Sequence, residues 1–546
     1  MTTPLPTLPT EAAAKADLLA QQAAPIAPPS SPPTTPKAKP SAGPSNTPPA
    51  SAPGPPDGGP YRMPPGLKYP LHFYLFKPWV KLGEPIRLFE HLHKVFGPIS
   101  YYRFLGTPII FVNDPAYVRE VLINQAPSFI KERTLKRMKI LLGEGLITSD
   151  DPIHMRQRRI AAPAFHRQRI SAYGDQIVSI ASAESSQWRP GQTVDINAAM
   201  MELSLRIIAR TLFDTEVTPD ILSINVETNT IMELYNFLVA FPMIESVLHL
   251  PIPGIVKFRR SRARLDAIVG NLISARRQEM QANPGRDRGD LLSMLIASRY
   301  ETEDQITQAP GREAPVSAGH VSAGLVSKDP ASEGMDDTQI RDEVLTIFLA
   351  GYETVANALA WTWYLLSQNP GPEADLHAEL DTVLGSSQGT GQARRLPTMA
   401  DLPNLRYTEQ VFAEAMRLYP PAWAMGRMAT KPFTLGPYRI PAGAHVFFSQ
   451  YVMHRSPEFY PDPLRFDPSR HTPENKAGRD KFVYFPFGGG SRQCIGESFA
   501  WMEGILAIAT IAASWRMRYQ DAHPPVPQAR ITLRPRDPMH MQLTHR

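Results

Sequence analysis

The strongest constraint on this chain is the segment at residues 487–496, because it carries the only cysteine among 546 residues. Without a second cysteine no intrachain disulfide can form, so Cys494 is either an inert buried side chain or a reactive thiolate. Three successive glycines allow the backbone to approach a bulky flat group closely, and Arg492 adds positive charge two residues before the sulfur. The apolar spacing of residues 496–513 predicts a helix whose N-terminus favours an anion at Cys494. This context favours the thiolate over the inert side chain.

A thiolate on a glycine-rich loop at a helix start is one way in which proteins hold a haem iron. Five residues carry a specific resemblance, since they match every fixed position of the haem-binding signature of the cytochrome P450 superfamily: Phe487, Gly490, Arg492, Cys494 and Gly496. The chain therefore resembles a soluble, bacterial-type haem-thiolate monooxygenase. The resemblance implies haem b with Cys494 as axial thiolate and metal ligand. It also implies a mainly α fold, a single large helical domain with small β-sheets, in which haem lies between a long central helix and the cysteine loop.

A second match lies in the long helix predicted for residues 336–366, which opens on acidic residues that suit a helix N-terminus. A glycine inside an apolar helix costs about 1 kcal/mol relative to alanine, so Gly351 needs a reason. Ala350, Gly351, Glu353 and Thr354 resemble the oxygen-activation motif of the family. The resemblance implies that Gly351 lets the helix open, that Thr354 supplies a hydroxyl and that Glu353 relays protons. Taken alone, Glu353 and Thr354 would more often be ordinary residues of a polar helix face, and the presence of the cysteine loop favours the catalytic interpretation.

A third match is Glu414 with Arg417, an acid and a base three residues apart on a predicted helix. Alone, such a pair is common on protein surfaces and contributes little stability. In the resembled family it is joined by an arginine from a Pro-x-Arg-Phe segment, which Arg465 supplies here. The resemblance implies a buried structural network in which the loss of one member would leave its partners unpaired.

Basic side chains are candidates for the haem propionates. His154 and Arg158 lie four residues apart and share one face of a predicted helix. By resemblance Arg158 and Arg427 reach the propionates with Arg492, and His154 stands where many family members have Trp. A solvated basic face remains the alternative for the other arginines of residues 156–169.

The resemblance places the substrate pocket beside an extended segment formed by Ala422, Trp423, Ala424 and Met425. Residues 438–443 are predicted to form a hairpin turn into a strand at residues 444–449. Residues 530–543 are predicted to form a last strand pair whose turn, at residues 535–538, could touch the substrate. A further hairpin is predicted from residues 99–104 and 107–112, followed by a helix start at residues 113–115.

Two segments are predicted to lie outside the folded domain of residues 63–546. Residues 1–62 form a Pro/Ala/Ser-rich tail, with seventeen of the 57 prolines in the first sixty positions, and are predicted to be disordered. Residues 300–335 are rich in Gly, Pro, Ser and Ala and are predicted to form an exposed insertion.

Composition limits the partners. A net charge of +5 without a dominant basic block argues against nucleic-acid binding. No apolar run of about 18 residues and no signal peptide are evident, so we expect a cytoplasmic monomer without a transmembrane anchor. Because no flavin or Rossmann glycine fingerprint and no ferredoxin cysteines are present, a separate ferredoxin or flavodoxin with its NAD(P)H reductase is implied.

The reaction class implied by the resemblance is insertion of one atom of O2 into an apolar organic substrate. A lipid, terpenoid or aromatic compound is the default expectation, because such pockets are mainly apolar. Two alternatives remain open. A peroxygenase would use hydrogen peroxide directly, although peroxygenases lack the acid–threonine pair of Glu353 and Thr354. A haem-thiolate sensor without catalytic activity would need neither that pair nor a redox partner.

Overall fold

The computed structural model describes residues 61–74, 76–80, 84–240, 250–283, 288–298, 335–385 and 394–546. The predicted tail lies outside the described residues except for Tyr61 and Arg62, and the predicted insertion lies outside them except for Met335. The chain divides into two units, residues 1–54 with 521–524 and residues 55–520 with 525–546. All elements described below belong to the second unit. The backbone of Arg62 forms an isolated β-bridge with Arg439 in this unit, so regular backbone pairing begins one residue before the predicted domain boundary at residue 63.

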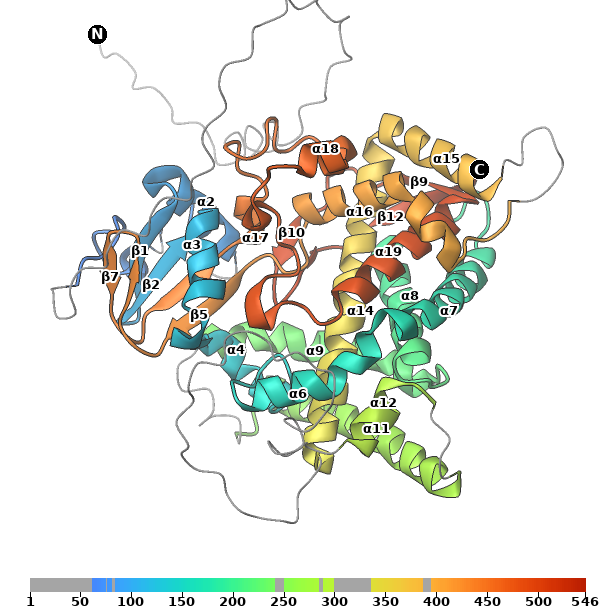
Figure 1. The fold of residues 1–546 in the computed structure, drawn as a ribbon, viewed down its shortest axis with the longest axis horizontal. Helices are drawn as coiled ribbons and strands as arrows, with labels where there is room; N and C mark the ends of the chain where they lie inside the picture. Colours follow the sequence, from blue (N-terminus) through green and yellow to red (C-terminus); the bar gives the residue numbers. More distant parts are fainter. Residues whose placement is uncertain are drawn as a thin grey trace, which may run out of the picture. The chain divides into compact units, whose positions relative to one another are not determined.

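Helices make up most of this unit (Figure 1). The α-helices are α2 (Pro85–Phe96), α3 (Pro115–Arg119), α4 (Arg133–Arg137), α5 (Lys139–Leu142), α6 (Ile153–Ala161), α7 (Arg167–Ser186), α8 (Ile196–Thr211), α9 (Pro219–Ala240), α11 (Pro253–Ala282), α12 (Leu291–Ala297), α14 (Asp337–Gln368), α15 (Pro370–Leu384), α16 (Arg406–Leu418), α17 (Gln450–Met453), α18 (Pro473–Lys476) and α19 (Glu497–Ala512). The shorter turns of helix are η1 (Leu71–Tyr74), η2 (Glu120–Asn124), η3 (Ala126–Ser128), η4 (Ala162–Phe165), η5 (Met399–Asn404), η6 (Pro468–His471), η7 (Lys481–Val483) and η8 (Gly490–Arg492).

The central element is α14, which the acidic start in the sequence predicts. Asp336 caps it by accepting a hydrogen bond from the Gln339 backbone N–H at 2.8 Å, and the Gln339 side chain completes a capping box. The helix ends at Gln368, two residues beyond the predicted end. It is buried on nearly all sides and packs against α8, α16 and α19 (Figure 1). The tertiary packing of an apolar helix, more than its propensity, therefore holds the core together.

The burial of α14 also decides a question about membranes. Among the described residues, α14 alone is long and apolar enough to cross a bilayer, although the sequence was expected to hold no such segment. However, 83% of its most apolar stretch is buried inside the structure, which is the environment of a core helix.

Four small sheets accompany the helices. The strands are β1 (Ile99–Phe104), β2 (Thr107–Val112), β3 (Phe129–Lys131), β4 (Thr193–Asp195), β5 (Met425–Ala429), β6 (Phe433–Leu435), β7 (Tyr438–Ile440), β8 (His445–Phe448), β9 (Trp515–Tyr519), β10 (Pro527–Ala529), β11 (Leu533–Pro535) and β12 (His540–His545). The largest sheet has the order β1-β2-β8-β5-β3, with β2 and β8 parallel. The predicted β1–β2 hairpin is confirmed: Ile99 pairs with Val112, and Leu105 and Gly106 adopt positive φ in the turn. The predicted helix start at α3 is confirmed too, with Asp114 as its cap.

Two strand predictions are wrong in their pairing. Residues 438–443 do not form a hairpin with the following strand, because β7 pairs with β6 while β8 joins β2 and β5 in another sheet. The last strand pair is not formed around residues 535–538 either. There β11 turns back on β10 through residues 530–532, and β12 pairs with β4 and β9. Local turn residues mark where the chain bends, whereas the partner of each strand depends on distant segments.

Candidate haem site and its network

The cysteine loop lies between η8 and α19, and Gly496 is the residue that precedes the helix. The predicted helix after the cysteine is thereby confirmed. The loop is closed by a hydrogen bond from the Cys494 backbone N–H to the Phe487 carbonyl at 3.0 Å. The Cys494 side chain is exposed, yet the surrounding protein desolvates the thiol and raises its pKa to about 11. The residue therefore has exposed surface although protein atoms surround its sulfur.

The charges near the sulfur differ from the expectation. Arg492 donates to the Ser149 carbonyl at 3.0 Å and to the Asp151 carboxylate at 3.3 Å. Arg158, in contrast, donates to the carbonyl of Gln493 at 2.7 Å, and it lowers the pKa of Cys494 in opposition to burial. The protein alone therefore does not ionise the thiol, whereas a coordinated metal ion deprotonates a ligating thiol outright.

The glycines of the loop are required by protein contacts. Gly490 has a φ of +76°, and a Cβ there would lie 2.1 Å from the Leu122 carbonyl oxygen. A Cβ on Gly489 would lie 2.7 Å from the Phe482 ring. These close approaches are to a backbone carbonyl and to an aromatic side chain.

The middle of α14 is less buried at the predicted motif than the parts of the helix on either side. Ala350, Gly351 and Thr354 are only half buried, although residues 342–349 and 355–363 of the same helix are fully buried. The Thr354 hydroxyl donates to the Ala350 carbonyl at 2.8 Å, one helical turn back. This bond leaves the oxygen of Thr354 free to act as an acceptor on the half-buried side.

Gly351 lies where α14 contacts α8. The helix runs unbroken from Asp337 to Gln368, so Gly351 does not open it in this structure. A Cβ at this position would lie 2.8 Å from the Ile208 side chain of α8. The glycine therefore leaves room for the end of the Ile208 side chain where α8 packs against α14.

Glu353 is turned away from solvent, with only 8% of its surface exposed. Its Oε1 accepts a hydrogen bond from the Thr532 hydroxyl at 2.6 Å, and Asn357 Nδ2 donates to the same hydroxyl oxygen at 3.2 Å. Burial raises the pKa of Glu353, and the Thr532 bond, Arg534 and Arg530 oppose this shift. Sequence reasoning missed Thr532 and Asn357, because a contact across 179 residues leaves no local pattern.

A second set of side chains gathers positive charge at the interior. Burial and then Arg492 and Arg427 lower the pKa of Lys131 to about 6. Burial and Arg492 lower the pKa of Arg427 to about 10. Burial, Arg492 and Lys131 lower the pKa of His154 to about 4, against a contact of 3.3 Å between its Nδ1 and Asp151. Cations that destabilise one another in this way are suited to an anionic ligand.

These observations test whether the residues fit a haem. The propionates of haem b would add negative charge beside the cluster of Lys131, His154, Arg427 and Arg492, in which Arg492 already contacts Asp150 at 3.6 Å and Asp151 at 3.3 Å. Among the described residues no group of three His, Cys, Asp or Glu side chains could hold a metal ion by itself. Cys494 would thus be a lone axial donor to an iron whose other ligands a porphyrin provides, and the residues fit. Lys131 is a member that the sequence argument missed, since β3 carries no recognisable motif.

The structural network around Glu414 exists, but one predicted member is wrong. Glu414 and Arg417 are fully buried and paired at 2.7 Å. Arg465 contributes its backbone carbonyl to Arg417 at 3.1 Å, while its side chain is exposed. The side chains that reach Glu414 belong to η6: His471 at 2.9 Å and Arg470 at 3.4 Å. The sequence holds a second Pro-x-Arg run at residues 468–470, and this signal could have found them.

Hydrogen bonding explains why this network persists. Burial alone would raise the pKa of Glu414, but hydrogen bonds from His471 and Arg417 hold it below its ordinary value. Arg417 also donates to the carbonyls of His454 and Pro463, both at 2.7 Å. The network thereby ties α16 to the segment that leads to the cysteine loop.

The predicted pocket segment is half buried at Ala422, Trp423, Ala424 and Met425. Trp423 donates from its indole nitrogen to the Arg530 carbonyl at 2.8 Å and packs near Phe89. A Cβ on Gly488 would lie 3.1 Å from the Met425 methyl group. Met425 therefore adjoins the cysteine loop, while Trp423 supports the β10–β11 turn.

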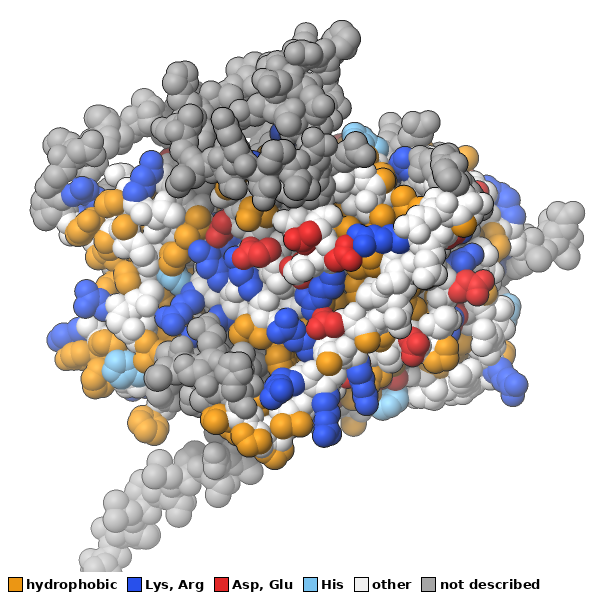
Figure 2. Space-filling view, turned by 90° about the horizontal axis from the view of Figure 1, so that it is seen from below, with side chains coloured by type: hydrophobic (Ala, Val, Ile, Leu, Met, Phe, Trp, Pro, Cys, Tyr) orange, Lys and Arg blue, Asp and Glu red, His pale blue; other side chains and the backbone are white. Residues whose placement is uncertain are grey.

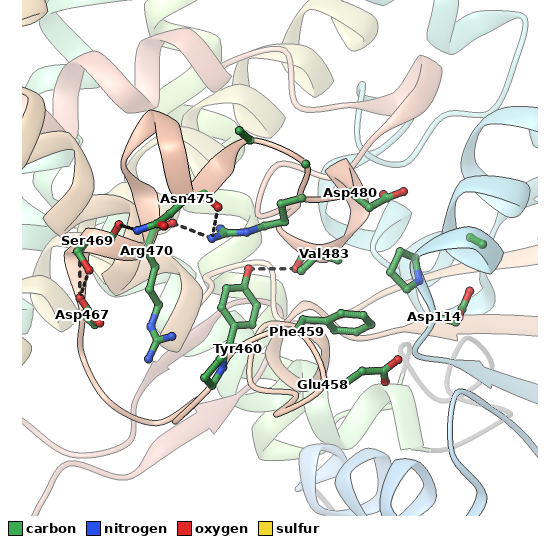
Figure 3. Close-up of a pocket in the computed structure, with 16 residues that line it drawn as sticks. Asp114, Glu458, Phe459, Tyr460, Asp467, Ser469, Arg470, Asn475, Asp480 and Val483 are labelled. Carbon is green, nitrogen blue, oxygen red and sulfur yellow. Dashed lines mark hydrogen bonds between the residues drawn. The ribbon is translucent and has the colours of Figure 1, made fainter. Parts of the chain in front are cut away.

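A separate surface pocket of about 840 Å³ lies between α3 and residues 458–483 (Figure 3). Its lining mixes carboxylates such as Asp480 with Arg470 and Arg479, and the Tyr460 hydroxyl donates to the Val483 carbonyl at 3.4 Å. None of the residues predicted to bind haem or to activate oxygen lines it. This pocket is distinct from the site built around Cys494.

Comparison with known proteins identifies the family. The family model for cytochrome P450 matches residues 64–542. Cyclooctatin synthase of Streptomyces melanosporofaciens is 37% identical over 80% of this chain and 86% of its own length. Cyclooctat-9-en-7-ol 5-monooxygenase of the same organism is 36% identical over 74% of this chain and 79% of its own length. Pentalenene oxygenase of Streptomyces avermitilis is 31% identical over 80% of this chain and 88% of its own length.

Solved structures agree on the fold. The cytochrome P450DA heme domain superimposes with a TM-score of 0.71 at 24% identity, over 89% of this chain and 98% of its own. The retinoic acid-bound cyanobacterial CYP120A1 gives a TM-score of 0.69 at 23% identity, over 89% of this chain and 100% of its own. The expected mainly helical haem-domain fold is confirmed. The chain belongs to the cytochrome P450 family and is an oxidoreductase of the monooxygenase class.

Proposed function

We propose that this protein binds haem b through the Cys494 thiolate and inserts one atom of O2 into an apolar organic substrate. The observation that carries the proposal is that two motif sites are incompletely buried. One is the exposed but desolvated thiol of Cys494, and the other is the half-buried patch of Ala350, Gly351 and Thr354 in an otherwise buried helix. The helix that follows Cys494, α19, packs against α14.

Haem b supplies O2 binding and reductive O–O cleavage, which an axial thiolate favours. The substrate, O2, NAD(P)H and one proton give a hydroxylated product, water and NAD(P)+. Within the protein, Arg427 and Arg492 would hold the propionates as cations, with Lys131 and His154 beside them. Arg158 would fix the Gln493 carbonyl and so the orientation of the neighbouring Cys494.

Two residues of α14 would manage protons. Thr354 presents a hydroxyl oxygen whose own proton is donated to the Ala350 carbonyl, so the oxygen can accept a hydrogen bond from a reactant. Glu353 has a pKa raised by burial, so a larger fraction carries a proton at neutral pH than for an ordinary glutamate. A protonated carboxyl beside a fixed hydroxyl is suited to general acid catalysis.

Electrons would come from a separate ferredoxin or flavodoxin with its NAD(P)H reductase. Arg156 and Arg159 are exposed on α6, while His154 and Gln157 of the same helix are buried. Seen from below Figure 1, the surface carries spread-out Lys and Arg side chains with acidic side chains among them (Figure 2). An acidic redox protein would be steered to α6 by such charges.

The names of the relatives narrow the substrate. Two of them are named for cyclooctat-9-en-7-ol and for pentalenene. We infer an unsaturated, cyclic and mainly apolar hydrocarbon skeleton, or an alcohol derived from it, for this protein as well. Half-buried Met425 and Ala424 are apolar, in keeping with this class.

Reconstitution tests the proposal. The haem-loaded protein is supplied with NADPH, a surrogate ferredoxin and its reductase, and candidate cyclic alkenes are selected by the shift of the Soret band. Oxygenated product that requires NADPH and the ferredoxin is the expected result. Product with hydrogen peroxide alone would indicate a peroxygenase instead. A bound haem without any product across substrates that shift the band would contradict the proposal.

A further inference from the structure

The turn between β10 and β11 carries a buried hydroxyl that the family motifs do not include. Thr532 is 6% exposed and lies at residues 530–532, where the two strands reverse direction. Its partners Glu353 and Asn357 sit one helical turn apart on α14. The turn therefore meets the long helix next to Thr354.

The chemistry of the three groups orients the hydroxyl. The Asn357 side-chain nitrogen can only donate, so at 3.2 Å it uses a lone pair of the Thr532 oxygen. The single proton of Thr532 is then directed to Glu353 Oε1 at 2.6 Å. With Oε1 engaged as an acceptor, the proton of a neutral Glu353 belongs on Oε2. The contact thus determines which carboxyl oxygen can deliver a proton.

The turn itself is held rigidly on several sides. Trp423 donates to the Arg530 carbonyl at 2.8 Å, and the Leu533 N–H donates to the Pro421 carbonyl at 2.9 Å. The Arg530 N–H donates to the Thr532 carbonyl at 3.0 Å across the turn. Because these bonds fix the backbone on either side of Thr532, its hydroxyl is preorganised and not merely in contact.

The same strand reaches a second helix. Arg534 of β11 donates to the Asn229 side chain of α9 at 2.7 Å, and its charge also lowers the pKa of Glu353. The short strand pair therefore joins α9 and α14 through Arg534 and Thr532.

We propose that Thr532 is a positioning residue for oxygen activation, which holds the Glu353 carboxyl in one orientation so that Oε2 faces the reaction site. The inference rests on the proposed role of Glu353 as proton donor. A Thr532 that merely fills space would support stability without affecting how reducing equivalents divide between product and hydrogen peroxide.

The experiment compares Thr532→Val, Thr532→Ser and the control Thr362→Val in the haem-loaded, full-length protein. Thr362 is a fully buried threonine of α14, the helix that carries Glu353. Its hydroxyl donates to the Ala358 carbonyl at 2.7 Å. In Thr532→Val, hydrogen peroxide released per NADPH should rise about two- to tenfold, the effect of losing one ordinary hydrogen bond on a partition ratio. Thr532→Ser should restore the wild-type ratio, and Thr362→Val should leave it unchanged.

A second readout does not depend on turnover. Thermal unfolding midpoints are compared for Thr532→Val, Glu353→Ala and the double variant. Because the two side chains are bonded, the double variant should lose about 1–2 °C less than the sum of the single losses. Should Thr532→Val not fold, Thr532→Ala replaces it in both measurements.

The outcomes separate the two proposals. The role of Thr532 would be overturned if the losses in unfolding midpoint of the two single variants simply add in the double variant. It would also be overturned if Thr532→Val is active and releases the same amount of hydrogen peroxide per NADPH as the wild type. Either result would leave the proposed function standing. Absence of product from the unmodified protein would overturn the proposed function, while coupled midpoints would still show the Thr532–Glu353 contact.

Discussion

Cys494 shows at the scale of one residue how surroundings decide chemistry. Burial raises the pKa of its thiol to about 11, and Arg158 with the backbone of Gly496 offsets only part of that shift. The thiol is thus neutral by itself, and an iron that bound there would displace its proton. The affinity for haem iron is accordingly expected to rise with pH.

Replacement of the ligand is the direct test at this scale. The reduced carbon monoxide complex of the wild type should absorb at the long-wavelength position typical of thiolate ligation. Cys494→His should move the band to the position of nitrogen-ligated haem, because imidazole donates less electron density than a thiolate. An absorption spectrum of the variant that still shows the thiolate band would contradict the assignment.

Thr354 provides a second residue-scale prediction, which concerns proton placement. Thr354→Ala should retain haem content, substrate affinity and NADPH consumption, but product per NADPH should fall several-fold, with hydrogen peroxide rising to match. Thr362→Ala is the matched control, since Thr362 makes the same bond to the carbonyl four residues back. If the two variants form the same amount of product per NADPH, the hydroxyl at position 354 does not direct the protons.

At the scale of elements, the α16–η6 contact shows how a buried charge network is assembled. Glu414 has no exposure and receives Arg417, Arg470 and His471 from two segments of the chain. Removing Glu414 would leave the buried Arg417 without its charge partner, and removing one basic member would weaken the compensation of the buried Glu414 carboxylate.

The network yields a comparison of two arginines. Arg470→Ala should lower the free energy of unfolding by about 2–3 kcal/mol, because its charge partner Glu414 is fully buried. Arg465→Ala should change it by less than about 0.5 kcal/mol, because its side chain is exposed and only its backbone carbonyl takes part. Denaturant unfolding of both variants measures the difference, and a larger loss for Arg465→Ala would refute the assignment.

Helix α19 carries a buried acid that makes stability depend on pH. Burial raises the pKa of Glu503 from an ordinary 4.5 to about 8, partly offset by Ser204. Between these two values the folded state keeps a proton that the unfolded state has released. The stabilising contribution is therefore complete below about pH 4.5 and is lost as pH rises toward 8.

The isosteric Glu503→Gln variant cannot titrate, so it should remove this dependence. Thermal midpoints of wild type and variant, measured from pH 5 to pH 8.5, should diverge as pH rises, with the variant becoming relatively more stable. Parallel curves would show that Glu503 does not stay protonated in the folded state.

At the scale of the whole molecule, the surface charges govern association with a redox protein. Arg156→Glu with Arg159→Glu should slow reduction by an acidic ferredoxin about tenfold at low salt, and the difference should shrink as salt rises. Lys77→Glu with Lys94→Glu makes the same change in net charge at exposed positions outside α6 and is the control. Stopped-flow reduction rates that respond equally to both pairs would refute α6 as the docking face.

Local sequence determined those parts of this protein that depend on neighbouring residues. The cysteine loop, the capped start of α14 at Asp336 and the β1–β2 hairpin all follow from spacings within about ten residues, and the structure contains them where predicted. A capping side chain, a turn glycine or a helical stripe acts over one or two turns of chain, so its signal is readable locally.

Only the tertiary structure decided which distant groups meet. It placed Thr532 beside Glu353, and Lys131 near Arg427 and Arg492. Beside Glu414 it placed Arg470 and His471 in the position that was predicted for Arg465. It also paired β11 with β10. It also showed that Gly351 accommodates Ile208 of α8. Such contacts arise because packing and burial select partners by three-dimensional proximity, and desolvation then sets the pKa of each group that is enclosed. Apart from the Pro-x-Arg run at residues 468–470, no spacing along the chain carries that information.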